Sequence, residues 1–400
     1  MAIFSSFSGM FQNSKSTDGV LNSPSYVPSI KWLLLASIGC LLVLSLLMVT
    51  SASIPFTEKY PKMGELFFFK RQLAYAVLGS FMAYTMTRIP LKWVYHLNVQ
   101  FFVLLVTLIL LIVTLFGSEI NGAKRWIELG VINFQTAELA KLVVIVFTAD
   151  FVVRRSSEVR TSWDGFIRIL VIVGLITLLL LAQPDFGSVA IIAGCVLTIF
   201  WVAGAPMKQF AAMATMVAVF AYFAIVRSDY RLGRVTSFMN PFDDIQDTDY
   251  QLARSIIAFG RGEFNGVGYG ESVQKLAHLP EAHTDFLLAI TGEELGFIGV
   301  ACVLLLEATV IACIMRISYL ALKRKQMRIS YTAFGIATMF IGQTLVNAGM
   351  NMGLLPTKGL TMPFFSYGGS AMLMSMIMIG LVLRICKESA EIPANQSRNY

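Results

Sequence analysis

The segment LPEAHTDFLLA (279–289) places Asp285 where a polar stretch turns into a long apolar run. A carboxylate at such a boundary between water and lipid could act as a general base that removes a proton from a hydroxyl group. Glu281 in the same turn is a second candidate base, whereas we expect His283 to be a solvated loop residue. A structural role is the alternative, because Thr284 or Asp285 could cap the helix that follows.

A second pair of ionisable residues, Glu138 and Lys141, lies in TAELAKL (136–142), at the start of another apolar run. The i,i+3 spacing places both side chains on one face of a helix. Charged side chains within a membrane usually face the protein interior or a polar cavity. The pair is therefore either an ion pair that holds two helices together or part of an anion site. Lys124 and Arg125 precede it, and a locally basic end suits a phosphate-bearing lipid.

Three further glutamates, Glu293, Glu294 and Glu307, lie in or near the apolar run that follows Asp285. The sequence offers no partner for them, so we interpret them as residues of helix packing or of a polar network. Five glycines precede this run, namely Gly260, Gly262, Gly266, Gly268 and Gly270. They follow no predicted strand, so a flexible loop is favoured over a nucleotide-binding loop.

Two short motifs predict backbone geometry rather than chemistry. The run QPDFG (183–187) separates two apolar stretches and is typical of a tight turn. The run GGS (368–370) lies in an apolar stretch, where small residues indicate a close approach of helices. The five cysteines all lie within or at the ends of apolar runs, which predicts packing residues and neither disulfides nor a zinc site.

The elements that position these residues follow from composition. The chain has 400 residues, of which 56% are hydrophobic and 14% charged, and its mean hydropathy is +0.70. Soluble domains carry about 25% charged residues, and here the apolar residues form runs of about twenty, the length that crosses a bilayer. A soluble enzyme, a disordered chain, a coiled coil and a disulfide scaffold are excluded. We predict an all-α, polytopic membrane protein, because helices satisfy their own backbone groups in lipid.

The apolar runs predict about ten transmembrane helices, near residues 31–53, 73–92, 96–117, 136–153, 166–182, 185–204, 207–226, 285–315, 329–351 and 363–386. These form one transmembrane domain (31–386) between an N-terminal tail (1–30) and a C-terminal tail (387–400). A large loop (227–284) separates helices seven and eight. Its aromatic content predicts a partly ordered cap, with short helices around 248–259 and 271–277.

The distribution of basic residues predicts the orientation of the chain. If the N-terminus is cytoplasmic, the inside segments hold more Lys and Arg than the outside loops, as the positive-inside rule requires. Both tails are then cytoplasmic, and loop 227–284 and Asp285 are periplasmic. The net charge of +7 is divided among many loops, so we expect no nucleic-acid partner.

Five segments resemble the SEDS family (shape, elongation, division and sporulation). They are NGAKRWIELG (121–130), QTAELAKL (135–142), QPDFGSV (183–189), LPEAHTDFLLAITGEELG (279–296) and LPTKGLTMPFFSYGGSA (355–371). They occur in order across nearly the whole bundle, and the last two favour the division branch over the elongation branch. One departure is Thr136-Ala137, where the family often has proline, but Glu138 and Lys141 keep their spacing.

The resemblance implies a peptidoglycan glycosyltransferase that polymerises lipid II at the outer face of the bacterial inner membrane, at the division septum. The family's catalytic aspartate corresponds to Asp285. Its functional acidic and basic residues correspond to Glu138 and Lys141, and Arg125 falls in a matched loop. We add Lys124 and Gln135 as substrate-binding candidates.

The resemblance also implies partners. The family works with a class B penicillin-binding protein, and we expect other divisome proteins as well. A divalent cation, Mg²⁺ or Mn²⁺, is a conceivable cofactor, with Glu138 and Asp285 as its candidate ligands. Two other functions remain open from the residues alone, a lipid II flippase with the same polar cavity and a non-catalytic divisome scaffold.

Overall fold

The computed structural model describes residues 26–59, 64–119, 123–128, 130, 133–227, 233, 238, 242, 250–276 and 279–391. Residues 1–25 of the predicted N-terminal tail, most of the stretch 228–249 and residues 392–400 lie outside the described residues.

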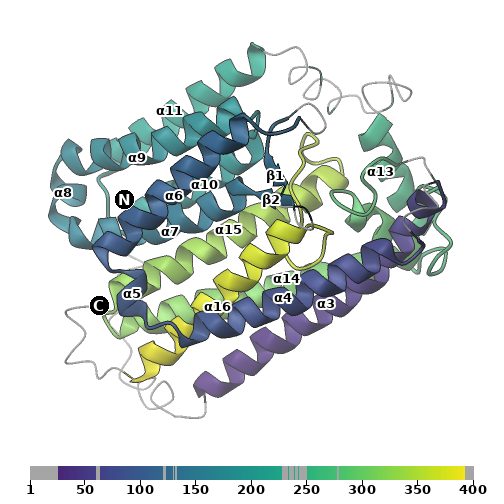
Figure 1. Ribbon diagram of the computed structural model, residues 1–400, viewed down its shortest axis with the longest axis horizontal. Coiled ribbons are helices and arrows are strands. Elements are labelled where there is room, and N and C mark those ends of the chain that lie inside the picture. Colours follow the sequence, from purple (N-terminus) through teal and green to yellow (C-terminus); the bar gives the residue numbers. More distant parts are fainter. Residues whose placement is uncertain are drawn as a thin grey trace, which may run out of the picture.

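Within these ranges, ten helices of 17 residues or more form the bundle in Figure 1. They are α3 (Tyr26–Lys59), α4 (Phe67–Arg88), α6 (Leu97–Leu115), α7 (Thr136–Arg154), α9 (Trp163–Ala182), α10 (Phe186–Val202), α11 (Met207–Val226), α14 (Leu287–Lys323), α15 (Met327–Asn351) and α16 (Gly369–Glu391). The helices match the ten predicted runs one for one, with bounds that differ by up to eight residues. The last helix begins at Gly369 rather than near 363, because the residues before it form a turn.

The remaining elements mark the two ends of the bundle. Helix α13 (Tyr250–Gly262) and the antiparallel hairpin of β1 (Trp126–Glu128) and β2 (Asn133–Gln135) lie toward one end, which we call the α13 end (Figure 1). The short helices α5 (Leu91–Val94) and α8 (Ser156–Thr161) lie at the opposite end, the α8 end.

Six of the helices are long and apolar enough to cross a membrane, namely α3, α6, α9, α14, α15 and α16. The chain is therefore a mostly helical, multi-pass membrane protein, and the β1–β2 hairpin is the departure from the predicted all-α fold. Helix α7 is excluded from that set by the charges of Glu138, Lys141, Asp150 and Arg154, and α10 is shorter, at 17 residues. Almost all of the α7 side chains are buried, so other helices surround it.

Small residues let the helices approach closely. A methyl group added at Gly380 of α16 would lie 2.4 Å from the carbonyl oxygen of Ala83 in α4. One added at Gly335 of α15 would lie 2.7 Å from Ile145 of α7 and 2.9 Å from Ile199 of α10. Helix association in lipid depends on such close packing, because burying apolar surface gains little there.

Charged groups tie the helices together at the α8 end. The buried carboxylate of Asp150 pairs with Arg154 of its own helix and, at 2.9 Å, with Arg328 of α15. The Glu388 carboxylate accepts hydrogen bonds from the Leu91 amide (2.9 Å) and from Arg384 (2.6 Å). These contacts join regular helices to one another.

The segment before Asp285 differs from two expectations. The predicted helix near 248–259 is present as α13, but residues 271–276 form turns instead of a helix. The flexible-loop interpretation is also wrong for two of the five glycines, Gly262 and Gly266. A methyl group at Gly262 would lie 1.8 Å from the carbonyl oxygen of Gly292, and one at Gly266 would lie 2.2 Å from that of Glu294. These glycines permit a close contact with α14.

Candidate active site

Asp285 lies in a turn immediately before α14. The amides of Thr284 and Phe286 both donate to the carbonyl oxygen of Glu281, at 3.1 and 3.2 Å. Phe286 is the residue that precedes the helix, which has no side-chain capping hydrogen bond. The hydroxyl of Thr284 donates to the Glu281 side chain instead, at 2.8 Å. The Thr284 hydroxyl therefore does not cap the helix, and the capping role of Asp285 stays a prediction.

Two asparagines of α15 hold the backbone at Asp285. The side-chain amides of Asn347 and Asn351 donate to its carbonyl oxygen at 3.0 and 2.9 Å. Asn351 also accepts from the amide of Ala289 in the first turn of α14, at 3.1 Å. Both asparagines are fully buried. None of the sequence motifs includes them, although two asparagines four residues apart in an apolar helix are a signal for a functional site.

The matched segment 355–371 approaches the carboxylate of Asp285. A methyl group added at Gly359 would lie 3.1 Å from Asp285 Oδ2. The next carbonyl, that of Leu360, accepts from Asn347 at 2.7 Å. The Leu360 side chain lies against Gly187, where an added methyl group would be 3.0 Å away. Segments that are far apart in the sequence thus meet around Asp285.

The QPDFG run forms the predicted turn and also starts α10. The carboxylate of Asp185 accepts from the amide (3.2 Å) and the hydroxyl (2.7 Å) of Ser188, so Asp185 is the N-cap of the helix. The Arg125 guanidinium donates to the carbonyl oxygens of Gln183 (3.3 Å) and Pro184. Lys358 lies over the ring of Phe186, with 5.8 Å between Nζ and the ring centroid. Basic groups therefore approach this turn from two sides.

Glu138 and Lys141 form an ion pair within α7, with 2.6 Å between Glu138 Oε1 and Lys141 Nζ. Both side chains are buried, which confirms that the i,i+3 pair faces the protein interior. Among the described residues, Glu138 is the hydrogen-bond partner of Lys141, and an ammonium group has three donors. Because both residues belong to α7, the pair does not join two helices, and its geometry suits an anion site.

The other two substrate-binding candidates have different surroundings. Lys124 is exposed. The backbone amide of Gln135 donates to the hydroxyl of Ser370 (2.9 Å), which in turn donates to the carbonyl oxygen of Asn133 (2.7 Å). The hairpin is thereby fastened to the start of α16. The close approach predicted for the GGS run is confirmed, because a methyl group at Gly369 would lie 2.7 Å from the ring of Tyr75.

His283 is packed among aromatic rings and is not the solvated loop residue that the sequence predicts. Its ring centroid lies 4.5 Å from that of Phe68, 5.6 Å from Tyr367 and 5.8 Å from Phe56. Burial lowers the pKa of His283, and the neighbouring Glu281 opposes this shift. Burial also raises the pKa of Tyr367 to about 12. Both rings are therefore neutral at neutral pH.

A divalent cation does not fit the residues predicted to bind it. In the part of the chain that the structure describes, no three His, Cys, Asp or Glu side chains are grouped as metal ligands. Glu138, one of the two candidate ligands, is paired with Lys141. We therefore derive no step of a reaction through a metal ion.

Comparison with known proteins places the chain in a family. A family model described as "cell cycle protein" matches residues 31–391. A probable peptidoglycan glycosyltransferase FtsW from Acinetobacter baylyi is 44% identical over 362 residues, covering 90% of each chain. The protein of the same description from Coxiella burnetii is 41% identical over 362 residues, covering 90% of this chain and 96% of its own.

Solved structures have the same fold. A chain from a peptidoglycan synthase complex that coordinates polymerization and crosslinking superimposes with a TM-score of 0.72 at 24% identity, covering 90% of this chain and 98% of that one. The rod shape determining protein RodA of Thermus thermophilus gives a TM-score of 0.66 at 25% identity, covering 89% and 96%. The family match over 31–391 and the identity to these relatives show that the chain belongs to the SEDS family, the family of FtsW and RodA.

Proposed function

We propose that this protein is a peptidoglycan glycosyltransferase that polymerises lipid II for septal wall synthesis. The relatives that share 41–44% of its sequence carry the description of probable peptidoglycan glycosyltransferase. The observation that carries the proposal is the state of Asp285. Its backbone carbonyl is held by two buried asparagines at the start of α14, and Gly359 of the matched segment 355–371 lies against its carboxylate.

Glycan extension joins two sugars. A hydroxyl oxygen of the acceptor sugar forms a bond to the anomeric carbon of the donor, and the bond from that carbon to the pyrophosphate oxygen breaks. Asp285 accepts the hydroxyl proton as general base. The pyrophosphate leaves with the bonding electrons as an anion and needs no proton.

Positive charge near the leaving group lowers the barrier, because it stabilises the charge that develops on the pyrophosphate. Lys141 supplies an ammonium group held in place by Glu138. Arg125 and Lys358 lie around the 183–187 turn, next to the segment that contacts Asp285. The Arg125 guanidinium donates to the carbonyl oxygens of Gln183 and Pro184, so Arg125 also fixes the turn. Lys124 and Gln135 would extend the substrate-binding surface along the hairpin.

The arrangement in the membrane belongs to the same proposal. All ten long helices would cross the bilayer, with the α8 end in the cytoplasm and the α13 end outside. This is supported by the basic residues at the α8 end, which include Arg154, Arg328 and Arg384, and by the positive-inside rule. Asp285 would then face the outer side of the inner membrane, at the division septum. A class B penicillin-binding protein would supply the cross-linking, and other divisome proteins would complete the assembly.

A polymerisation assay tests the proposal. Purified protein with its cognate transpeptidase receives lipid II, and the glycan product is measured for the wild type and for Asp285→Asn. We expect glycan from the wild type and a loss of about 10²–10⁴-fold in the variant, the usual contribution of a general base. Near-normal synthesis by Asp285→Asn would remove Asp285 from catalysis and direct attention to Glu281. Transbilayer movement of lipid II without glycan would support a flippase instead.

A further inference from the structure

Helix α14 is broken at Gly296, eleven residues after Asp285. Gly296 has φ 65° and ψ −162°, far from helical values, and the helical hydrogen bonds are interrupted there. The amides of Phe297 and Ile298 would donate to residues four positions earlier in a continuous helix. They donate instead to the carbonyl oxygens of Glu263 (3.0 Å) and Phe264 (3.3 Å).

The carbonyl groups freed by the break have new partners in the same segment. The carbonyl oxygen of Glu293 accepts from the amide of Val267 at 2.9 Å, and that of Glu294 accepts from Gly268 at 3.1 Å. Segment 263–268 therefore fills the gap and satisfies both sides of the broken helix. Irregular backbone is tolerated in such a protein where it is buried against other parts of the chain.

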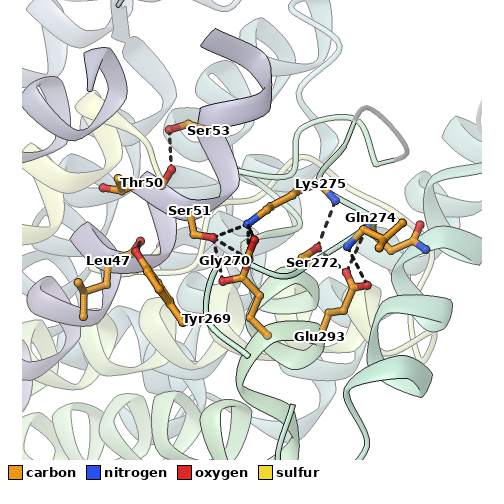
Figure 2. Close-up of polar contacts among 12 residues, drawn as sticks. Leu47, Thr50, Ser51, Ser53, Tyr269, Gly270, Ser272, Gln274, Lys275 and Glu293 are labelled. Carbon is orange, nitrogen blue, oxygen red and sulfur yellow. Dashed lines mark hydrogen bonds and ion pairs between the residues drawn. The ribbon is translucent and has the colours of Figure 1, made fainter. Parts of the chain in front are cut away.

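The side chain of Glu293 fixes the following turn. It is fully buried and accepts from Arg261 of α13 at 2.7 Å. It also accepts from the hydroxyl of Ser272 (Figure 2). The backbone amides of Val273 and Gln274 also donate to it, each at 3.2 Å. One carboxylate thus orders four groups of the segment that precedes Asp285.

The neighbouring Glu294 connects this segment to α3. Its buried carboxylate accepts from Ser51 at 2.6 Å and from Lys275 at 2.7 Å. Lys275 also donates to Ser51 (2.8 Å) and to the carbonyl oxygen of Gly270 (2.6 Å), so three separate elements meet at one ammonium group (Figure 2). The interpretation of both glutamates as polar-network residues is thereby confirmed.

This arrangement bears on Asp285. The helical segment Leu287–Leu295 is separated from the rest of α14 by the break, so lateral contacts determine its position. Asn347 and Asn351 hold its first turn, and Glu293 and Glu294 hold its last. A short helix moves as a rigid body, so a shift at one end is transmitted to the other.

We propose that Glu293, Glu294 and Lys275 are positioning residues that hold Asp285 in its reactive place by clamping the segment Leu287–Leu295. The proposal rests on the proposed glycosyltransferase function. None of the three residues contacts Asp285, and they act through the rigid segment between the break and the turn. Loosening the clamp displaces the base and slows the chemical step, while the groups that bind the lipid pyrophosphate stay in place.

The test compares two buried carboxylates that undergo the same substitution. Glu294→Gln loosens the clamp, and Glu388→Gln removes a paired carboxylate at the α8 end of the same bundle. We expect Glu294→Gln to lower kcat about 10-fold or more, since a misplacement of about 1 Å can cost about 100-fold, with KM for lipid II within about twofold. Glu388→Gln should lose thermal stability but keep kcat. An equal loss of kcat in both variants would overturn the proposal.

Two milder variants keep the test decisive if Glu294→Gln folds poorly. Ser51→Ala removes a single donor and should lower kcat in the same direction, whereas Lys275→Arg keeps the charge and should retain more activity than Lys275→Met. A wild-type kcat in both Ser51→Ala and Lys275→Met would overturn the clamp.

Hydrogen exchange separates this proposal from the proposed function, because it needs no activity. Amides of residues 285–289 should exchange about 10-fold faster in Ser51→Ala and Lys275→Met than in the wild type, and unchanged exchange would refute the clamp. If the wild type made no glycan, the proposed function would fail, and hydrogen exchange would still decide whether the clamp holds the turn.

Discussion

The α13 end and the α8 end both contain buried carboxylates paired with basic residues, but the carboxylates at the two ends contact different kinds of structure. At the α8 end, Asp150 joins α7 to α15, and Glu388 joins α16 to the start of α5, all regular helices. At the α13 end, Glu293 and Glu294 hold turns and a broken helix. The same chemistry serves packing at one end and, in the function we propose, the placement of Asp285 at the other.

The difference has an energetic reason. A regular helix satisfies its interior backbone groups itself. The carboxylates at the α8 end therefore bind mainly basic side chains, together with the Leu91 amide at the start of α5, and add to helix association. A turn has free amides and carbonyls, and a buried carboxylate can satisfy several of them at once, as Glu293 does. We therefore expect substitutions at the α13 end to affect activity more than stability, and substitutions at the α8 end to do the opposite.

The largest effect after Asp285 itself is expected at Lys141. Lys141→Met should reduce polymerisation about 100-fold or more, because it removes a charge near the leaving group. It also leaves Glu138 buried without its partner, at a cost of about 3–5 kcal/mol of stability. The double variant Glu138→Gln, Lys141→Met separates the two effects. The double variant should regain thermal stability but not glycan synthesis. Recovery of both would identify a purely structural ion pair.

A loss of about 10-fold in kcat is expected for Asn351→Ala, because the turn that carries Asp285 loses a donor to its carbonyl and an acceptor for the Ala289 amide. Thr338→Val is the matched control on α15, since the Thr338 hydroxyl only bonds within its own helix. The steady-state polymerisation rate is measured for both variants. Equal rates in the two variants would mean that Asn351 does not position the turn.

A smaller effect, a loss of a few-fold, is expected for Gly359→Ala. The added methyl group would approach Asp285 Oδ2 to 3.1 Å, closer than ordinary van der Waals contact, so the carboxylate must shift. Gly174→Ala in α9 is the control, because a methyl group there has nothing within 4 Å. Polymerisation by the two variants at equal protein concentration decides the matter, and a normal rate for Gly359→Ala would show that the contact is loose.

The smallest effect concerns acid stability. Burial lowers the pKa of His283 below its value of 6.5 in an unfolded chain, so the unfolded state binds the proton more readily. This contribution to stability is present above pH 6.5 and is lost as the pH falls below it toward the folded pKa. Lowering the pH from about 7.5 to about 5.5 should therefore reduce the thermal unfolding midpoint of the wild type more than that of His283→Phe. The same fall in both proteins would assign the acid sensitivity to other groups.

Much of the fold follows from the sequence. The apolar runs predicted the helices with bounds that differ by up to eight residues, because a chain in lipid can satisfy its backbone only within each segment. The pairing of Glu138 with Lys141 also follows, since i,i+3 neighbours meet in any helix. The turn at 183–187 is encoded locally too, by residues that form turns on their own.

Tertiary structure decided the surroundings of Asp285. Its carbonyl is held by residues 62 and 66 positions away, and Glu294 finds its partners 19 and 243 positions away. The periodicity of apolar residues does not predict such pairs, because it indicates only which face of a helix is apolar. Gly262 and Gly266 illustrate the limit: their spacing resembles that of a flexible loop, and only the carbonyl groups of α14 that lie against them show why a side chain is excluded there.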